Sequence, residues 1–459
     1  MNHPTKTIRK TPTSLPTLQP MVAGIDIGSS QHWVAGPPKE DAEPNVRVFG
    51  TTTPDLTALV DWLVKQGVTS AAMESTSVYW IPLYELLESR GIQPVLVNAR
   101  QLHHVPGRKT DFQDCQWLQL LHSRGLLRGS FRPTEAITRL RALHRQMGNL
   151  VAARSRYVQW IQKALDQMNV QVHRAVADLT GKTGMAIVRA IVAGERDPVR
   201  LARHRDARCR KSVEEIARAL VGTWREEHLF NLTSALRLYD AIEQEIASYD
   251  ARMLAELEAL QPPERQDQEP PRHPNPAKEK SIRQQGGQAL RTTLWRLAGV
   301  DLMRIEGIGP GAAQTILSEV GTDLSAFPSE SHFVSWLRLC PRTPISGGKP
   351  VKKRHNGLGA NRIAGVLRMA AVSVQRSKTA LGATFRRIAR HKGAAVAVFA
   401  TARLLAQLVY RMLRHGQDYV DIGEKAYEAK YQSRRLAALK EAAKSFGCTL
   451  VEEDPALAV

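Results

Sequence analysis

The sequence predicts an α/β domain near the N-terminus, followed by two largely helical regions. Between residues 21 and 121, short apolar runs typical of buried strands alternate with amphipathic helical patterns. From Thr134 onward the apolar spacing is helical, and a polar, Pro-rich stretch over 261–287 interrupts it. We therefore expect a disordered tail over 1–20, an α/β domain over 21–130, a helical or coiled-coil region over 131–260, a linker over 261–292, a mostly helical domain over 293–417, and a charged helix and tail over 418–459.

The α/β domain is predicted element by element from these patterns. Strands are expected over 21–27, 32–35, 46–50, 70–73 and 93–97, and helices over 55–66, 78–89 and 111–121. The first three strands are close enough in sequence to form an antiparallel meander. Three strands, a helix, a strand, a helix and a strand is the element order of a ribonuclease H-like core of the RuvC type.

The middle region begins with one long, Arg-rich helix over 134–169. Further on, apolar residues recur at mostly three- and four-residue steps, close to a heptad seam. These residues are Leu229, Leu232, Leu236, Tyr239, Ile242, Ile246, Tyr249 and Met253. Such a seam serves equally well for a dimeric coiled coil and for packing against another helix of the same chain, and both readings remain open.

Positive charge is concentrated in the C-terminal half. The chain of 459 residues has a formal net charge of +20, with a pI of about 10.1. The segment between Glu330 and Asp418 contains 17 Lys and Arg and no acidic residue. A merely solvated surface mixes both signs of charge, so this segment indicates a polyanionic partner.

The cysteines and the apolar stretches exclude several other classes of protein. The four cysteines are widely scattered without a C-x-x-C pair, so neither a zinc site nor a disulfide framework is indicated. This pattern fits a reducing cytoplasm. The N-terminus lacks the apolar core of a signal peptide. The longest apolar stretch, over 394–410, contains Arg403 and Gln407, and we expect it to be too short and too polar to span a membrane.

Four carboxylates lie within or next to predicted elements of the α/β domain. Asp26 lies within an apolar strand, Glu74 closes another, and Asp111 and Asp114 share one face of a predicted helix. Each acid alone is better explained as a cap or a surface charge, and Asp111 can simply cap its helix. As a set, however, like charges at the ends of successive core elements favour a divalent cation, Mg²⁺ or Mn²⁺. Such an ion would activate a hydroxyl or water and neutralise a phosphate.

Asp26 also permits a different interpretation. Actin-like ATPases and sugar kinases open with a strand that carries Asp-x-Gly, whose glycine lets a phosphate approach. Those proteins need a second Asp-x-Gly loop on a matching strand. The other one here, Asp421-Ile-Gly423, lies close to the C-terminus with no following domain. The ATPase interpretation therefore ranks low.

A glycine-rich stretch between two predicted helices resembles a helix–hairpin–helix. Its glycines, Gly307, Gly309 and Gly311, lie in Arg304-Ile-Glu-Gly-Ile-Gly-Pro-Gly311. Glycines permit a tight turn whose backbone N–H groups, at a helix N-terminus, can bind a nucleic-acid phosphate. Taken alone, the motif fits a packing hairpin without a ligand about equally well.

A serine lies in the basic segment just downstream. Ser346 is followed by Gly347, Gly348 and Lys349, and then by Lys352, Lys353 and Arg354. The glycines allow close approach of the backbone, and the cations would hold a phosphate. A serine hydroxyl becomes a good nucleophile only when a base, a metal or a cationic field activates it. By itself, such a loop is more often a flexible phosphate-binding loop.

Together these residues resemble the insertion-sequence transposases that pair a DEDD RuvC-like domain with a C-terminal serine domain, the bridge-RNA-guided recombinase family. The N-terminal match comprises Asp26, Glu74 and the Lys-Thr-Asp111-x-x-Asp114 helix. The C-terminal match comprises Ile305 to Gly309, Glu319, Phe327-Pro328, Leu339-Cys-Pro341, Ser346-Gly347, Gly359-Ala-Asn361-Arg362 and Leu367-Arg368. One departure is Arg338, which stands where the family has a small residue, usually glycine.

The resemblance implies a mechanism and partners. The four acids would bind Mg²⁺, and Ser346 would attack a DNA phosphate to give a phosphoserine intermediate, with cations including Arg362 holding nucleic acid. An element-encoded structured RNA would pair with donor and target DNA, and a homo-oligomer, dimer or tetramer, would assemble the composite site. Two rivals stay open: a RuvC-like nuclease that hydrolyses DNA junctions without needing Ser346, and a non-catalytic nucleic-acid-binding scaffold that tolerates loss of all four acids.

Overall fold

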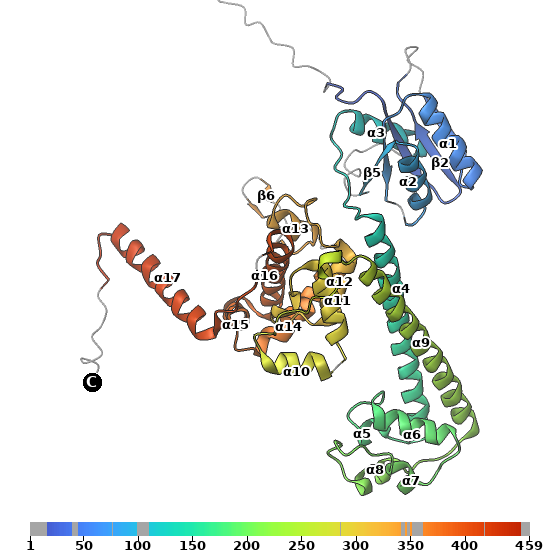
Figure 1. Cartoon of the computed structure of the whole chain (residues 1–459), viewed down its shortest axis with the longest axis vertical. Coiled ribbons are helices and arrows are strands. Elements are labelled where there is room, and N and C mark those ends of the chain that lie inside the picture. The colour runs from blue at the N-terminus through green and yellow to red at the C-terminus, as the bar shows by residue number, and fades with distance from the viewer. Residues whose placement is uncertain are drawn as a thin grey trace, which may run out of the picture. The chain divides into compact units, whose positions relative to one another are not determined.

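A computed structural model of the chain describes residues 16–38, 45–75, 77–98, 110–284, 286–340, 345–346, 349–350, 361–416 and 418–450. The chain divides into two compact units, Met1–Arg132 and Pro133–Val459 (Figure 1). The first unit contains the strands β1 (Val22–Ile27), β2 (Gln31–Ala35), β3 (Val46–Gly50), β4 (Ser70–Glu74) and β5 (Gln93–Val97). Its helices are α1 (Thr53–Lys65), α2 (Trp80–Ser89) and α3 (Asp111–Ser123).

The five strands form one mixed sheet in the order β3-β2-β1-β4-β5. The β1, β2 and β3 strands are antiparallel neighbours, whereas β4 and β5 run parallel to β1. This is the mixed sheet that the ribonuclease H-like prediction requires. The observed elements agree with the predicted ones to within two residues at each end. The backbone N–H groups of Leu18 and Gln19 donate to the carbonyl of Ser123, so the end of the predicted tail contacts this unit.

Side-chain alternation along the strands assigns the two faces of the sheet. Ala23, Ile25 and Ile27 of β1 belong to an apolar core that they share with Leu59 of α1 and Leu83 of α2. The intervening β1 positions, which include Asp26, point to the opposite face, where α3 packs. The charged positions of β1 and α3 therefore lie on the side of the sheet away from its apolar core.

Among its described residues, the second unit has helices and one short β-hairpin as its regular elements. Its first helices are α4 (Glu135–Gln167), α5 (Val172–Ala175), α6 (Lys182–Val192), α7 (Pro198–Ala202), α8 (Val213–Ala219) and α9 (Glu226–Ala259). After these come α10 (Pro276–Gln284), α11 (Gln288–Ala298), the 3₁₀ turn η3 (Leu302–Arg304), α12 (Pro310–Val320) and α13 (Glu330–Trp336). The remaining elements are the strands β6 (Ile345–Ser346) and β7 (Lys349–Pro350), and the helices α14 (Arg362–Ser373), α15 (Ala380–Lys392), α16 (Ala394–His415) and α17 (Gly423–Ser445).

The predicted heptad seam packs within the chain. The helices α4 and α9 lie side by side (Figure 1) and are antiparallel, since Arg154 pairs with Glu243 at 2.7 Å and Arg139 lies 3.8 Å from Glu256. The seam residues Leu232, Leu236, Tyr239, Ile246 and Met253 are buried. At the far end of this helix pair, α5 to α8 share an apolar core with α4 and α9. The structure thus supports the intramolecular alternative for the seam.

The predicted linker over 261–292 differs from the structure, because its second half is folded. It contains α10 and the start of α11, in which Arg291 is fully buried beside Asp301. The ring of His273 lies 3.1 Å from the carbonyl of Met303, and Lys278 donates to the carbonyl of Ile305 at 3.0 Å. The sequence does not reveal this folded part, because a polar composition is typical of a linker. Here the polar and charged groups of the segment form the contacts with the hairpin.

The apolar helix α16 has the length and composition of a membrane span. It packs against α13, α14 and α15, and Ala397, Leu405 and Val409 are buried there. The hydroxyl of Tyr410 donates to the carbonyl of Phe327 at 2.8 Å. These contacts account for the apolar composition as that of a core helix.

Candidate active site

The carboxyl ends of two parallel strands position Asp26 and Glu74. The strands β1 and β4 pair in parallel with Ile25 opposite Met73, so the next residue of each strand is an acid. Both acids follow apolar residues that are completely buried, and both are themselves half-buried. The hydrophobic cores of the two strands thereby place two carboxylates beside each other at the carboxyl end of the parallel pair.

Helix α3 reaches this edge because β1 carries a glycine. A Cβ atom on Gly24 would lie 2.2 Å from the backbone nitrogen of Gln119 and 2.3 Å from the carbonyl oxygen of Cys115. Only a residue without a side chain lets the two backbones come this close. The side chain of Gln119 also donates to the carbonyl of Val22 at 3.4 Å, and His122 lies 2.8 Å from the hydroxyl of Ser70. The seating of α3 on β1 and β4 is therefore fixed along its length.

The first turn of α3 carries Asp111 and Asp114, both exposed. The side chain of Thr110 caps the helix by accepting a hydrogen bond from the backbone of Gln113. The alternative in which Asp111 is the cap is therefore wrong, and Asp111 is the first helical residue instead. Phe112, between the two acids, packs edge-on against Trp33, whose backbone pairs with Asp26. These contacts turn the start of α3 toward the end of β1.

The electrostatics of Asp26 show that the four acids share one region. Burial first, and then the negative charges of Asp111, Asp114 and Glu74, together raise the pKa of Asp26 from 3.8 to about 6. Like charges this close destabilise one another unless a proton or a cation intervenes. The site thus has the electrostatic character of a cation site.

No metal-ligand cluster is preformed among the described residues, since no three acidic, histidine or cysteine side chains there lie close enough to hold an ion. The donor set nevertheless fits Mg²⁺ or Mn²⁺, because carboxylate oxygens are the ligands that these hard cations prefer. Cys115 does not compete as a nucleophile. Burial and the charge of Asp26 raise the pKa of its thiol to about 12.

Two features of this site escaped prediction. Gly24 lies in an apolar run that predicts a strand, and an isolated glycine within a strand is a recognised sign of close backbone approach. His32 on β2 is buried, and burial lowers its pKa, so the ring is neutral near pH 7. No sequence signal distinguishes this histidine from one on the protein surface.

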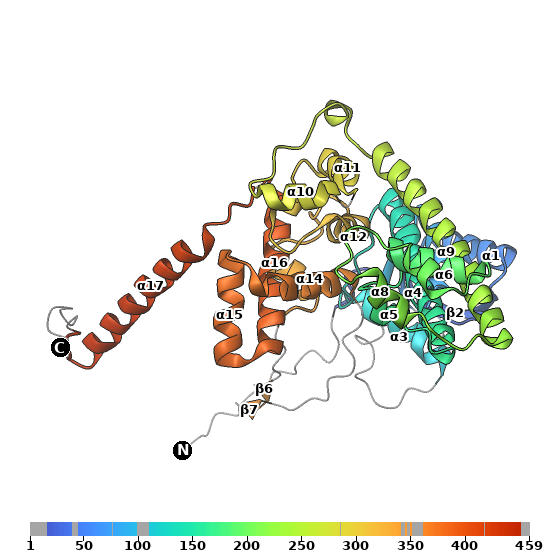
Figure 2. The same cartoon turned by 90° about the horizontal axis from the view of Figure 1, so that it is seen from below.

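Ser346 belongs to the second unit. Its backbone forms the short strand β6, which pairs antiparallel with β7 so that Ser346 is opposite Lys349; Figure 2 marks both strands. The predicted phosphate-binding residues Gly347, Lys352, Lys353 and Arg354 lie outside the described residues. Upstream, Arg338 has a φ of 59°, in the left-handed region that favours glycine. This conformation explains why a glycine would suit position 338 better than the arginine found there.

Arg362, a predicted nucleic-acid ligand, contacts a carboxylate. Its guanidinium lies 3.9 Å from Glu319, which is buried in α12. Two arginines of α4 share that carboxylate: Arg145 donates to both of its oxygens, at 2.9 and 2.8 Å, and Arg141 lies 3.2 Å away. Three cations around one acid leave an excess of positive charge, and this group joins α4 and α12 to the start of α14.

The glycine-rich stretch predicted as a helix–hairpin–helix lies between α11 and α12. Gly307 has a φ of 87°, and a Cβ atom there would lie 2.7 Å from the carbonyl of Ala370 in α14. Gly307 is therefore required for packing, in agreement with the interpretation that needs no ligand. A Cβ on Gly309 or Gly311 would meet open space, so both leave room for a close ligand.

Comparison with known protein families matches two regions of the chain. A DEDD transposase model of the IS110 group matches residues 23–170, which include the four acids. A second model, described as the transposase IS116/IS110/IS902 family, matches residues 301–386, which include the hairpin and Ser346. No curated protein matches the chain. The two regions occur in one chain and together span about half of it, and they identify the protein as an IS110-type transposase.

Proposed function

We propose that this transposase cuts and exchanges DNA strands with two sets of residues. Asp26, Glu74, Asp111 and Asp114 bind Mg²⁺ or Mn²⁺, and Ser346 forms a covalent bond to DNA. The observation that carries the metal site is the parallel pairing of β1 and β4, which places Asp26 beside Glu74, with the first turn of α3 bringing the charges of Asp111 and Asp114 close enough to raise the pKa of Asp26. A divalent ion relieves this repulsion by drawing the carboxylates together, and it supplies positive charge for the transition state of phosphoryl transfer.

The covalent step conserves the energy of the phosphodiester bond in an ester between serine and the DNA phosphate. The Oγ atom of Ser346 attacks a DNA phosphorus and displaces a deoxyribose hydroxyl, which takes up the proton. Attack by the hydroxyl of another strand then releases the serine. The cations of the basic segment support a developing alkoxide and the phosphate charge. Because each bond broken is replaced by one formed, exchange needs no external source of energy.

We also propose that a structured RNA encoded by the element directs this chemistry to donor and target DNA in the cytoplasm, within a homo-oligomer. Two observations support RNA guidance. The net charge of +20 fits large polyanionic partners, and the sequence has no helix marked for reading bases. Pairing by RNA would then provide sequence choice, while the protein contacts backbones.

Ser346→Ala tests the covalent step. The variant should keep its affinity for nucleic acid, because it loses one oxygen and no charge, and it should lose strand transfer. The wild-type adduct is trapped on a nicked substrate, seen on a denaturing gel and mapped by mass spectrometry. The exposed serines Ser331 and Ser335 serve as controls, since Ala at either should leave the adduct intact. Undiminished exchange by Ser346→Ala, or cleavage without an adduct, would leave hydrolysis by the acid site as the function.

RNA guidance is tested separately. We expect purified protein to retain or require a structured RNA, because nothing else in the proposal selects a sequence. RNase treatment should abolish site-specific recombination, and adding back RNA transcribed from the flanks of the element should restore it. Efficient recombination at the same site by RNA-free protein would refute guidance without affecting the chemistry of Ser346.

A further inference from the structure

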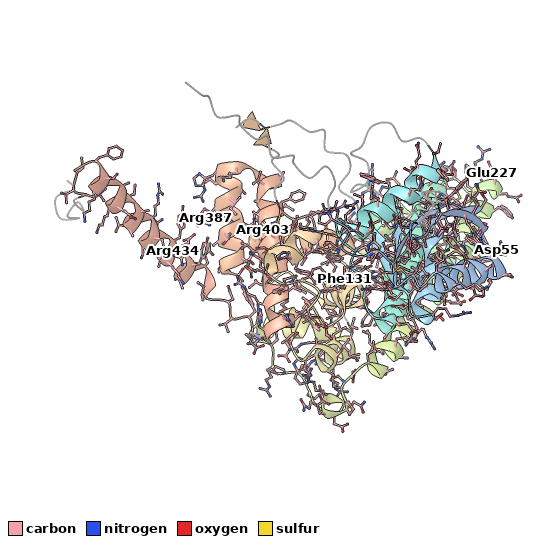
Figure 3. All side chains as sticks on the ribbon, turned by 90° about the horizontal axis from the view of Figure 1, so that it is seen from above. Asp55, Phe131, Glu227, Arg387, Arg403 and Arg434 are labelled. Atoms are coloured by element: carbon pink, nitrogen blue, oxygen red, sulfur yellow. The ribbon has the colours of Figure 1, made fainter. Side chains whose placement is uncertain are left out.

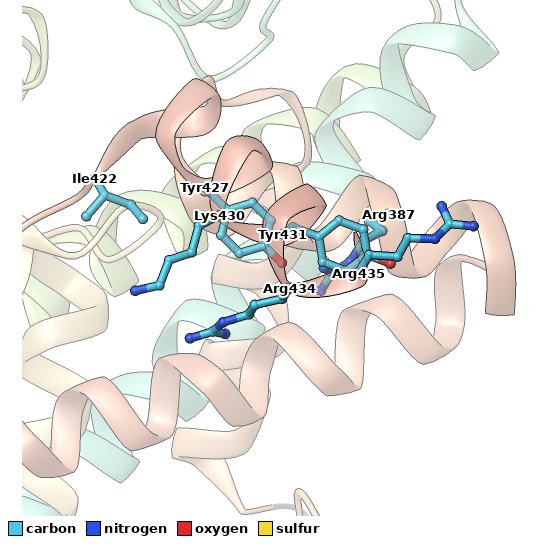
Figure 4. A pocket seen from close by; sticks show the side chains of 7 residues that line it. All are labelled: Arg387, Ile422, Tyr427, Lys430, Tyr431, Arg434 and Arg435. Atoms are coloured by element: carbon cyan, nitrogen blue, oxygen red, sulfur yellow. The ribbon is translucent and has the colours of Figure 1, made fainter. Parts of the chain in front are cut away.

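The C-terminal helix α17 presents a basic and aromatic surface that the proposed chemistry does not use. Side chains of α15, of α17 and of Ile422 just before it line an open hollow of about 640 Å³ (Figure 4). The side chains that line it are Arg387, Ile422, Tyr427, Lys430, Tyr431, Arg434 and Arg435. Figure 3 labels two of these cations, Arg387 of α15 and Arg434 of α17. No acidic residue lines this hollow, which is called the α15–α17 surface below.

The carboxylates near the start of α17 have other partners. Asp418 pairs with Arg304 at 2.6 Å, Asp421 accepts from the backbone of Ala380 at 3.0 Å, and Glu424 pairs with Arg386. These contacts anchor the beginning of α17 to the rest of the unit. In the part of the chain that the structure describes, no carboxylate forms an ion pair with Arg387, Lys430, Arg434 or Arg435. Four positive charges are thus left for an external partner.

The two tyrosines are held in place by one of these cations. The guanidinium of Arg387 lies 4.1 Å from the ring centre of Tyr431 and 5.3 Å from that of Tyr427. Cation–π contacts of this kind fix the rings while leaving them half-exposed. The rings are four residues apart on α17, one turn of helix, so both face the same side. The surface thus combines ordered rings with unpaired cations.

This combination of groups matches the chemistry of a single strand of nucleic acid. Bases of a single strand can stack on aromatic rings and on guanidinium planes, whereas bases in a duplex are already stacked on one another. The cations contact the phosphates on either side. From Tyr427 to Arg435 the helix rises about 12 Å, so the contact covers a short stretch of strand.

We propose that the α15–α17 surface binds single-stranded nucleic acid, with bases stacked on Tyr427 and Tyr431 and phosphates held by Arg387, Lys430, Arg434 and Arg435. RNA and the displaced strand of DNA offer the same chemistry to this surface. The proposal rests on the transposase acting on nucleic acid, but it does not depend on the acid site, on Ser346 or on RNA guidance.

Binding is measured by fluorescence anisotropy with labelled oligouridylate and oligothymidylate of equal length. The full-length protein carries Asp26→Asn, and EDTA is present, so that no strand chemistry contributes. Tyr427→Ala with Tyr431→Ala should weaken binding about fivefold or more, since stacking is lost, whereas the matching pair of Tyr→Phe changes should keep most of the affinity. These substitutions spare the core because α17 has no buried residue.

Two double variants that remove equal charge distinguish binding at this surface from non-specific electrostatic attraction. Arg434→Ala with Arg435→Ala should reduce the slope of log affinity against log salt by about two. The control, Lys425→Ala with Lys444→Ala, removes the same charge from exposed positions of α17 that do not line the hollow. This control should change the salt slope and the affinity less than Arg434→Ala with Arg435→Ala does.

Each outcome decides the proposal. Weaker binding by the Tyr→Ala and Arg→Ala pairs supports the proposal. If only oligouridylate is bound more weakly, the natural ligand is RNA; if only oligothymidylate, it is single-stranded DNA; if both, the surface accepts either strand. Equal losses in the Arg and Lys pairs, unchanged binding by the Tyr→Ala pair, or competition by polyglutamate as effective as by oligonucleotides would overturn it. Failure of the phosphoserine or guide-RNA proposal leaves these measurements unchanged, since they contain neither strand exchange nor a guide.

Discussion

Asp26→Asn is expected to abolish strand exchange and also to make the metal-free protein more resistant to unfolding at neutral pH. The loss should be about a thousandfold or more, because a catalytic metal contributes several kcal/mol to the transition state. The gain in stability and the binding of a metal ion have the same cause, the burial of Asp26 and the repulsion among the four carboxylates. Burial and the three neighbouring acids make the ionised form of Asp26 unfavourable in the folded protein. Asparagine keeps the shape of the side chain and removes its charge.

The sign of the pH dependence follows from the raised pKa. The pKa of Asp26 is about 6 in the folded protein, against the ordinary value of 3.8 that the unfolded chain is expected to show. Between these two values the folded state holds a proton that the unfolded state has released, so stability falls as pH rises through this window. The wild-type protein in EDTA should therefore lose stability between about pH 4 and pH 6 relative to Asp26→Asn.

The measurement compares unfolding midpoints across pH, with EDTA and with Mg²⁺. Mg²⁺ should restore stability to the wild type and do less for Asp26→Asn, because the variant lacks one ligand. Asp61→Asn is the matched control: it removes an exposed carboxylate of the same unit, paired with Arg90 at 2.8 Å, and should leave strand exchange unchanged. Glu74→Gln and Asp114→Asn should each abolish exchange. Full activity of any of these three variants, or of the wild type in EDTA, would contradict the metal site.

Arg291→Ala is expected to destabilise the second unit by about 3–5 kcal/mol, the cost of leaving one partner of a buried ion pair alone. Both side chains of the pair are 1% exposed, and the guanidinium donates to Asp301 at 2.7 and 3.0 Å and to the carbonyl of Pro271 at 2.8 Å. Asp301 also accepts from the backbone of Met303 at 3.0 Å and so caps η3. The pair thus joins α11, the preceding segment and the entry to the hairpin.

Hydrogen exchange of the backbone amides in α11 and α12 measures this loss locally. Arg296→Ala on the same helix is the control: its pair with Glu269, at 3.2 Å, is partly exposed, so it should cost about 1 kcal/mol or less. Arg291→Met combined with Asp301→Asn should recover much of the stability, because it removes both charges and keeps the cap on η3. Equal protection in Arg291→Ala and Arg296→Ala would show that the buried pair does not hold the hairpin.

The N-terminal unit was predictable because short apolar runs mark its strands and helical spacing marks its helices. Asp26 lies within one such run and Glu74 directly follows another, and the three-residue step placed Asp111 and Asp114 on one helix face. Sequence alone could not show which partner fills the seam of α9, because a seam has the same pattern in both cases. Nor could it pair Arg291 with Asp301, since local composition marks both as surface residues.

The shared carboxylate of Glu319 also restricts how the chain can vary in length. Arg141 and Arg145 reach it from successive turns of α4, while Arg154 further along the same helix pairs with Glu243 of α9. Each inserted residue rotates the rest of a helix by about 100°. An insertion between Arg145 and Arg154 would therefore break one set of contacts or the other. Natural variation in length, or a grafted domain, is better accommodated over 203–212, the mostly exposed connection between α7 and α8.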